Sequence, residues 1–262
     1  GPATRPFGLK AIPSLLPAFG VSVGDYVSSA CDLRQLLDKL LEGRFPSPAH
    51  ETILAPDVPK MGSCLQVSFG LHSFTAIEQA IIAGNGEEAM SFRQELPQEF
   101  SFTGGRIRQF AFKDFGFDPS LAPAGHRVIT CLIPVDDFAA WERLASDRGA
   151  YLAEKERIAG FCADQLENRF PGFRQALVTQ DIASPLTYQR YTGSDQGRYM
   201  TYIQTRENGA TLQAIPRQVP GLTGLWLAGM WVMAPGGVPS AIRTARDALQ
   251  LICHQDGRTF KT

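Results

Sequence analysis

The chain has 262 residues, of which 44% are hydrophobic and 19% charged, and its formal net charge at pH 7 is −1. This near-neutral balance, without a stripe of basic residues among aromatic ones, argues against nucleic acid as a ligand. The sequence contains no run of about 18 apolar residues, which argues against a membrane-spanning helix. Its length is ample for a packed core, in one large domain or two small ones.

The cysteines and histidines argue against a disulfide framework and against a metal site. The five cysteines are scattered and odd in number, which favours free thiols in a reducing compartment and hence a cytoplasmic protein. The four histidines show no ligand spacing, so we expect no metal. The five cysteines are Cys31, Cys64, Cys131, Cys162 and Cys253.

The first third of the chain predicts an arm, a strand, a helix and a loop. Gly1-Pro2 is typical of the residues left after tag removal, and residues 3–20 are Pro-rich and apolar, as in a short helix or an extended arm. Val21–Ala30 reads as a strand. Asp32–Leu41 has apolar residues at helical spacing, with Asp32 placed to cap the first turn. Pro46–Pro59 contains four prolines and predicts a loop.

The middle of the chain predicts strands separated by turns and helices. Leu65–Leu71 alternates strictly between apolar and other residues, which predicts a half-buried strand. Phe74–Glu88 carries apolar residues on a helical face. A turn at Gly104-Gly105 precedes a strand at Arg106–Phe112. A second turn region, Phe117–Gly125, leads into a buried, β-branched strand at Arg127–Ile133.

The last third mixes helices, strands and loops. Asp147–Phe170 is amphipathic and predicts the longest helix, followed by a strand at Ala176–Ile182. Ser184–Tyr202 and the polar segment Thr205–Ala210 are expected to be irregular. Leu225–Gly229 predicts a final strand. Ser240–Cys253 predicts a final helix, with an inner face formed by Ile242, Ala245, Leu249 and Ile252. This pattern indicates an α+β or α/β fold with an antiparallel portion.

The most informative stretch is the strand, glycine turn and helix near the C-terminus. Gly236-Gly237 follows the last apolar strand and precedes the last helix. Free backbone N–H groups and the helix dipole favour a polar or anionic ligand at such a point, and this layout is common where α/β folds bind cofactors. A tight turn is the structural alternative. No G-x-G-x-x-G motif occurs in the 262 residues.

Two further places are candidates for chemistry. Tyr188 and Arg190 lie close together near Tyr191, where they can hold a substrate oxygen or stack on a flat ring. An aromatic-capped loop with Arg190 bonded to carbonyls is the structural alternative. His72 follows the alternating strand and is a candidate for facing a pocket, although a single histidine without a partner more often has a packing role.

Several segments together are similar to the phytoene desaturase-like flavoprotein oxidoreductases, a group that includes carotenoid isomerases. The resemblance covers the C-terminal half of that family, from about residue 22 to the end. The segments that carry it are V-G-D-Y-V-S-S-A-C-D-L-R (23–34), F-D-P-S-L-A-P-A-G-H-R-V-I (117–129), W-E-R-L (141–144), L-E-N-R-F-P-G-F (166–173), S-P-L-T-Y-Q-R-Y-T-G (184–193) and L-W-L-A-G-M-W-V-M-A-P-G-G-V-P-S-A (225–241).

The resemblance implies an α+β fold in which a substrate-binding mixed sheet, covered by helices, accompanies the remnant of an FAD-binding domain. It implies an N-terminal arm at 1–21, a cofactor-domain strand, helix and loop at 22–61, a substrate domain at 62–215 that encloses an apolar tunnel, and a cofactor-domain strand, turn and helix at 216–262. The phenylalanines are expected to line the tunnel, whereas composition alone favours core filling. The residues implied to lie along the flavin are Gly229, Met230, Trp231, Gly236, Gly237 and Val238, with Ser29 and Ala30 near the pyrophosphate.

The resemblance also implies an activity. We expect an enzyme that acts on an apolar, polyene or isoprenoid-like molecule, as an FAD-dependent oxidoreductase or isomerase when a partner supplies the missing half of the flavin site. A flavin-independent isomerase or cyclase is the first alternative, and a non-catalytic apolar-ligand carrier is the second. Because half of a cofactor domain exposes apolar surface, we expect a homo-oligomer or a partner subunit.

Overall fold

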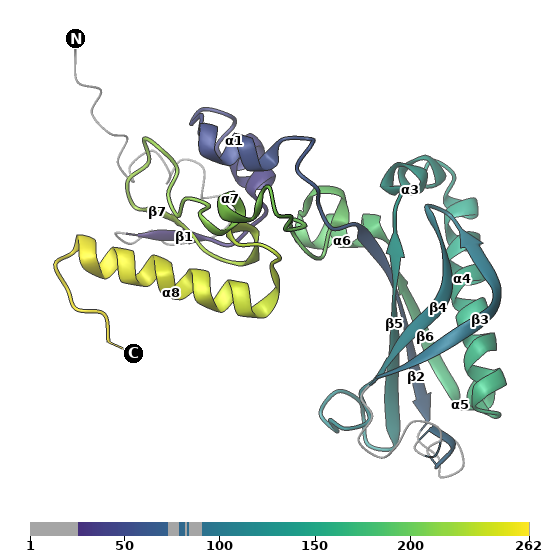
Figure 1. Cartoon of the computed structure of the whole chain (residues 1–262). Coiled ribbons are helices and arrows are strands. Elements are labelled where there is room, and N and C mark those ends of the chain that lie inside the picture. Colours follow the sequence, from purple (N-terminus) through teal and green to yellow (C-terminus); the bar gives the residue numbers. More distant parts are fainter. Residues whose placement is uncertain (1–25, 73–78, 82, 84–90, 262) are drawn as a thin grey trace. The chain divides into compact units, whose positions relative to one another are not determined.

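The computed structural model describes residues 26–72, 79–81, 83 and 91–261 and divides the chain into two compact units (Figure 1). The split unit contains the described residues up to Met61 and those from Thr192 onward, and the sheet unit runs from Gly62 to Tyr191. Sequence analysis placed boundaries after residues 61 and 215. Residues 192–215 therefore belong to the split unit.

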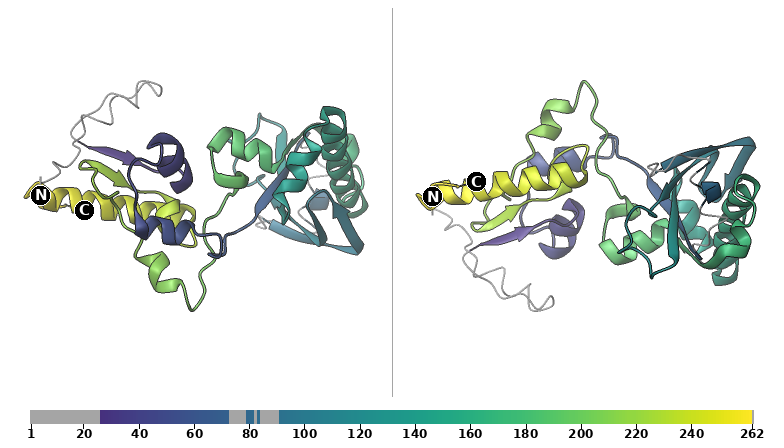
Figure 2. Two further views of the ribbon diagram at one scale, coloured as in Figure 1. Left: turned by 90° about the horizontal axis from the view of Figure 1, so that it is seen from above. Right: turned by 90° about the horizontal axis from the view of Figure 1, so that it is seen from below.

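The split unit is built around two parallel strands that come from opposite ends of its sequence. β1 (Val27–Ser29) pairs with β7 (Leu225–Leu227), and the Ala228 N–H donates to the Ser29 carbonyl at 2.9 Å. α8 (Gly237–Gln255) runs beside this pair (Figures 1 and 2). The other helical segments are η3 (Gln35–Leu40), α1 (Pro48–Leu54), η4 (Asp195–Gly197), α7 (Gly209–Gln213) and η5 (Met230–Val232).

The N-terminal part of this unit contains one helix that the sequence predicted and one that it did not. The predicted helix at Asp32–Leu41 is present, wound as a π-helix over Gln35–Leu40. The predicted loop at Pro46–Pro59 is wrong, because it contains α1. Pro48 stands at the first helical position, where its missing N–H costs nothing. The Glu51 carboxylate accepts from the Ser47 N–H at 3.3 Å and so closes the start of the helix.

The final helix is present, but its predicted inner face is wrong. The buried residues of α8 are Ser240, Thr244 and Ala248, whereas Ile242 is 66% and Leu249 52% exposed. The Thr244 hydroxyl donates to the Gly229 carbonyl at 2.9 Å and shares its hydrogen with carbonyls of its own helix. Small side chains let α8 approach the turn after β7 closely, and this approach turns the larger apolar residues outward. Ala245 is also exposed, and Ile252 is half-buried.

The sheet unit contains a five-stranded sheet in the order β3-β4-β5-β2-β6. The predicted mixed sheet is wrong for these strands, because all four neighbouring pairs are antiparallel. The expected turn at Gly104-Gly105 explains why β3 and β4 are antiparallel, since a connection this short joins only antiparallel strands. The strands are β2 (Ser63–His72), β3 (Ser91–Phe102), β4 (Gly105–Asp114), β5 (His126–Val135) and β6 (Leu177–Ala183).

One face of this sheet is covered by the long helix α4 (Arg148–Arg169), which confirms the predicted helix and its start at Asp147 (Figure 1). The Asp147 carboxylate accepts from the Ala150 N–H at 3.0 Å. The alternation predicted in β2 is also confirmed, with every second side chain buried in the core. Phenylalanines fill much of the described core of this unit, which is the role that composition alone favoured. They are Phe69, Phe92, Phe100, Phe102, Phe110, Phe112, Phe170 and Phe173.

A second unforeseen helix follows β6. Sequence analysis expected Ser184–Tyr202 to be irregular, and this is wrong for its first part, which forms α6 (Pro185–Thr192). The buried Ser184 begins the helix, because its carbonyl accepts from the N–H groups of Thr187 and Tyr188 at 2.9 and 3.1 Å. The short helices α3 (Phe138–Leu144) and α5 (Phe173–Ala176) complete the unit.

Some of the predicted elements lie partly or wholly outside the residues that the structure describes. The arm at 3–20 and the start of the strand at Val21–Ala30 lie outside the described residues, as does most of the helix at Phe74–Glu88, of which 79–81 and 83 are helical. All five cysteines are free, and three of them are buried. Among the described residues, no helix combines the length and the apolar character that crossing a bilayer requires.

Candidate functional site

The turn after β7 brings the predicted cofactor residues of both chain segments together. Gly229 has φ of +89°, and a β-carbon added there would lie 2.9 Å from the β-carbon of Ala30. Ser29 lies in β1 and pairs with Leu227. Met230 and Trp231 form the short helix η5 directly after Gly229. Ser29, Ala30 and Gly229 therefore meet at the carboxyl end of the parallel pair.

The Gly236-Gly237 turn combines a close packing contact with an open position. Gly236 has φ of +91°, and an added β-carbon would lie 3.0 and 3.1 Å from side-chain atoms of Thr201. Gly237 has φ of +80° and no neighbour closer to such a carbon than 3.9 Å. Val238, the next residue of α8, is 71% exposed. Close packing against Thr201 thus favours glycine at position 236, whereas at position 237 only the positive φ favours it.

Two kinds of unpaired donor lie at this turn. The Thr201 hydroxyl is fully buried and has no hydrogen-bond partner within the part of the chain that the structure describes. No side chain caps the start of α8, whose N-cap residue is Gly236. The first N–H groups of a helix lack partners within the helix, and its dipole favours negative charge there. The turn can therefore offer backbone and side-chain groups to a polar ligand.

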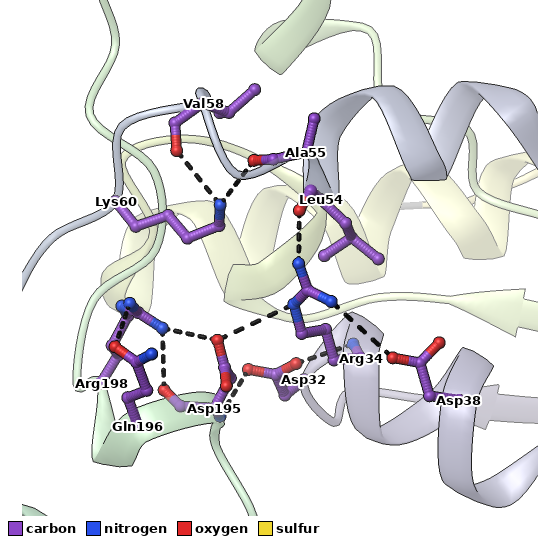
Figure 3. A network of polar contacts seen from close by, with 10 residues as sticks. All are labelled: Asp32, Arg34, Asp38, Leu54, Ala55, Val58, Lys60, Asp195, Gln196 and Arg198. Atoms are coloured by element: carbon purple, nitrogen blue, oxygen red, sulfur yellow. Dashed lines mark hydrogen bonds and ion pairs between the residues drawn. The ribbon is translucent and has the colours of Figure 1, made fainter. Parts of the chain in front are cut away.

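A network of charged residues forms the second part of the site (Figure 3). The Asp32 carboxylate accepts from the Arg34 N–H at 2.8 Å, as expected for a helix-start residue, and from the Asp195 N–H at 3.0 Å. The Asp195 carboxylate lies 2.6 Å from Arg198 Nη1 and 3.8 Å from Arg34 Nε. Lys60 donates to two backbone carbonyls, those of Ala55 and Val58, at 2.9 and 3.1 Å.

Burial perturbs the proton affinities in this network. Asp32 is 3% exposed, and loss of hydration raises the pKa of its carboxyl, against the effect of the backbone N–H donors. Burial is also the main cause that lowers the pKa of Lys60, and the positive charges of Arg34 and Arg198 lower it further. Burial raises the pKa of the Tyr202 phenol. Perturbed groups that line a shared pocket are typical of functional sites.

The two parts of the site adjoin each other. A narrow cavity is lined by Asp32, Arg34, Lys60, Asp195 and Arg198, and also by Trp231. Trp231 is one of the residues predicted to lie along the flavin. The charged network therefore lies next to the predicted cofactor segment within the split unit.

The three predicted catalytic residues all belong to the sheet unit and do not come together. Tyr188 and Arg190 lie on α6, and the Tyr188 hydroxyl donates to Gln66 Oε1 at 2.7 Å. The Arg190 guanidinium lies over the Tyr191 ring at 5.5 Å from its centre. His72 packs against the His126 ring at the other end of β2, six residues or about 20 Å from Gln66. His72 and Tyr188 therefore cannot act on one reacting atom.

Most of the charged network was not predicted from the sequence. Only a capping role was predicted for Asp32, and no role was predicted for Arg34, Lys60, Asp195 or Arg198. These residues have no characteristic spacing, because they come from positions 32–60 and 195–198 and meet only through the fold. Across the described ranges, no three side chains among His, Cys, Asp and Glu group as a metal site requires.

Comparison with known proteins finds one matching family and several relatives. The family described as flavin containing amine oxidoreductase matches residues 20–253. Prolycopene isomerase 2, chloroplastic, of an Oncidium hybrid cultivar is 29% identical over 139 residues, which are 50% of this chain and 23% of that protein. The 4,4'-diapolycopen-4-al dehydrogenase of Metabacillus indicus is 26% identical over 219 residues, which are 79% of this chain and 41% of that protein.

The matched regions extend the resemblance drawn from the sequence. Both relatives act on carotenoid-related molecules, according to their names, and this chain spans less than half the length of either. The family match covers both segments of the split unit and the whole sheet unit. This chain belongs to the flavin containing amine oxidoreductase family.

Proposed function

We propose that this chain acts on an apolar polyene or isoprenoid-like substrate, as an FAD-dependent oxidoreductase or isomerase, once polypeptide outside these 262 residues completes the flavin site. The family match supports the flavin, and the names of the two relatives support the substrate class and both reaction types. The observation that carries the proposal is the meeting of Ser29 and Ala30 with Gly229, directly after β7.

The turn fits one end of a flavin nucleotide. The unpartnered Thr201 hydroxyl, the open Gly237 backbone and the uncapped start of α8 supply donors at one place. The residues that would hold the group are Ser29, Ala30, Gly229, Met230, Trp231, Gly236, Gly237 and Val238. When bound, FAD supplies the electron and hydride chemistry that protein side chains lack.

The outward face of α8 supports the need for further polypeptide. Val238, Ile242, Ala245 and Leu249 recur at intervals of three or four residues, so they form one stripe, and all four are exposed. Beside it, β1 pairs only with β7 among the described residues. A parallel pair is normally part of a larger, covered sheet. We propose that the polypeptide that completes the flavin site covers this stripe and extends the sheet.

The sheet unit is the proposed substrate-binding part. On β2, Gln66 and Ser68 belong to the half-buried set opposite the α4-covered core. Tyr188 contacts this set through Gln66. We propose Tyr188 and Arg190 as groups that contact the substrate, with His72 as a candidate for the opposite end of β2.

A second candidate function follows from one feature of the sequence. Because the 262 residues contain no G-x-G-x-x-G motif, the chain by itself lacks the usual glycine turn for a nucleotide pyrophosphate. If it acts alone, the proposed reaction is a redox-neutral isomerisation or cyclisation. Such an enzyme works by positioning an apolar substrate and moving a proton. A carrier that binds polyenes without changing them is the non-catalytic alternative.

The deciding experiment is the visible absorbance spectrum of the protein after gel filtration, with and without added FAD. We expect retained flavin bands in the assembly that contains the completing polypeptide. Gly237→Ala is expected to weaken flavin retention, because it places a methyl group at the open turn. Gly257→Ala is the matched control, because Gly257 lies just beyond the other end of α8, has φ of +65° and is equally open.

The outcomes separate the candidates. Equal flavin loss in both variants would attribute the effect to helix stability rather than to flavin contact. A colourless assembly that still isomerises a polyene would establish the redox-neutral function. A colourless assembly that binds polyenes unchanged would establish the carrier.

A further inference from the structure

A polar pocket of about 420 Å³ opens beside the charged network of the split unit. Its lining contains three cationic side chains, Arg34, Lys60 and Arg198, and one carboxylate, Asp195. Three positive charges and one negative charge leave a formal excess of +2 on these walls. The remaining walls include Pro56, Val58 and Pro59, which are apolar over their side chains.

The single carboxylate in the pocket is committed mainly to one cation. Asp195 Oδ2 lies 2.6 Å from Arg198 Nη1, a short charged hydrogen bond. The same oxygen lies 3.8 Å from Arg34 Nε, which exceeds hydrogen-bond distance. Arg34 also lies 3.9 Å from the exposed Asp38 and donates to the Leu54 carbonyl at 2.5 Å. The Arg34 guanidinium therefore has two distant carboxylate partners and one uncharged hydrogen-bond acceptor.

Lys60 has no carboxylate partner in the described ranges. Its ammonium donates to the Ala55 and Val58 carbonyls, which use two of its three hydrogens. Lys60 thus shares the pocket lining with two further cations, Arg34 and Arg198, and with one carboxylate, so like charges repel one another there. A bound anion would relieve that repulsion.

We propose that the pocket binds an oxyanion, a carboxylate or a phosphate group, between Lys60 and Arg34. Arg guanidinium and Lys ammonium groups are the usual protein partners of both anions. The apolar wall of Pro56, Val58 and Pro59 would contact the body of a ligand that carries a carboxylate at its end. This site goes beyond the proposed function, because its occupation requires neither flavin nor a redox step.

The position of the pocket gives the site a role. Arg34, Lys60, Asp195 and Arg198 also line the narrow cavity that reaches Trp231. An oxyanion in the pocket is therefore held next to the segment proposed to hold the flavin. A carboxylate there would fix one end of an apolar chain, whereas a phosphate there would belong to a nucleotide or to free phosphate.

The test is isothermal titration of the purified chain with octanoate, acetate and pyrophosphate, each at constant ionic strength set with chloride. We expect saturable binding of at least one of the three. Lys60→Gln should weaken it about tenfold or more, the size typical of a lost charged hydrogen bond. Lys60→Arg should retain it. Lys39→Gln, which removes the same charge from an exposed position, should leave it unchanged.

The three probes identify the ligand class. Octanoate binding more tightly than acetate and pyrophosphate would assign an apolar carboxylate, and pyrophosphate binding most tightly would assign a phosphate. Saturable binding of none of them, or equal binding by wild type and Lys60→Gln, would overturn the proposal. If circular dichroism shows Lys60→Gln to be unfolded, Arg34→Gln decides instead. Its matched control is Arg44→Gln, an exposed arginine paired with Glu42 at 2.9 Å.

This test is independent of the proposed flavin function. The titration reports anion binding by the chain alone, and the absorbance spectrum reports flavin retention in the assembly. Loss of anion binding with intact flavin retention would refute only the pocket. Anion binding without any flavin would refute only the proposed function.

Discussion

The Asp32 carboxylate accepts a hydrogen bond at 3.0 Å from the backbone N–H of Asp195, a residue 163 positions later in the chain. This bond joins the two sequence segments of the split unit. The same carboxylate accepts from the Arg34 N–H at 2.8 Å, so one buried side chain starts a helix and also holds the segment after α6. The charged pocket depends on this link, because Asp195 and Arg198 lie on the segment that it holds.

Replacement of Asp32 tests this link. Asp32→Ala leaves two N–H groups without an acceptor, and each should cost about 1–3 kcal/mol in free energy of unfolding. Urea unfolding measures this loss. Asp38→Ala is the control, because Asp38 is 61% exposed and 3.9 Å from Arg34, and it should change stability by less than about 0.5 kcal/mol. Similar losses in the two variants would contradict the link.

The raised pKa of Asp32 predicts a pH dependence of stability. In the folded state burial raises this pKa above the ordinary value of 3.8. The folded state then binds the proton more readily than the unfolded state does, so the contribution of this group to stability is full below about pH 3.8 and declines as pH rises through the folded pKa. Asp32→Asn cannot titrate. The difference in unfolding free energy between wild type and Asp32→Asn should therefore vary across this window, and parallel pH curves would refute the prediction.

Substitutions at the glycine turn should differ in their cost. Gly229→Ala meets both a positive φ and the β-carbon of Ala30 at 2.9 Å, whereas Gly237→Ala meets only the positive φ. The strain of placing alanine at a positive φ costs about 1–3 kcal/mol at either position. The clash should therefore make Gly229→Ala the less stable of the two. Thermal unfolding of both variants checks this order, and equal midpoints would mean that β1 and the turn move apart without cost.

The stripe on α8 should be protected in the complete assembly. Ile242→Cys is expected to react with maleimide in the isolated chain, because Ile242 is 66% exposed. In the assembly with the completing polypeptide, its labelling should fall sharply. Gln250→Cys, exposed on the same helix but outside the stripe, should label equally in both states. Peptide mass mapping separates these sites from Cys31 and Cys253.

Two other labelling results would change the interpretation. Protection of Ile242→Cys in the isolated chain that disappears on dilution would identify a second copy as the occupant. Full labelling in the complete assembly would show that the stripe remains uncovered, and the proposal for α8 would be wrong.

The positions of Tyr188 and His72 predict that only one of them acts at the reacting atoms. Tyr188 contacts β2 at Gln66, and His72 lies six residues, or about 20 Å, further along that strand. Of Tyr188→Phe and His72→Gln, only one should lower kcat for a polyene substrate. Tyr188→Phe should also lower stability by about 0.5–1.5 kcal/mol, because it loses the bond to Gln66. A comparable fall in kcat for both variants would contradict this geometry.

The sequence by itself determined the local elements with strong periodicity. The alternation of β2, the amphipathic pattern of α4, the Gly104-Gly105 turn and the strand, turn and helix at the C-terminus were all predicted at nearly their observed bounds. Each of these patterns depends on neighbouring residues, which a single sequence contains. The resemblance to carotenoid-related flavoproteins also came from contiguous segments.

Only the tertiary structure decided the rest. Helices α1 and α6 both begin at prolines that follow serines. The four prolines of Pro46–Pro59 predict a loop where α1 forms, and the composition of Ser184–Tyr202 predicts irregular structure where α6 forms. The face of α8 that becomes buried was set by the small residues Ser240, Thr244 and Ala248, which allow close approach to Gly229. The charged pocket joins residues more than 130 positions apart, and no local pattern contains that information. Contacts between distant segments are fixed by packing and burial, and these depend on the whole fold.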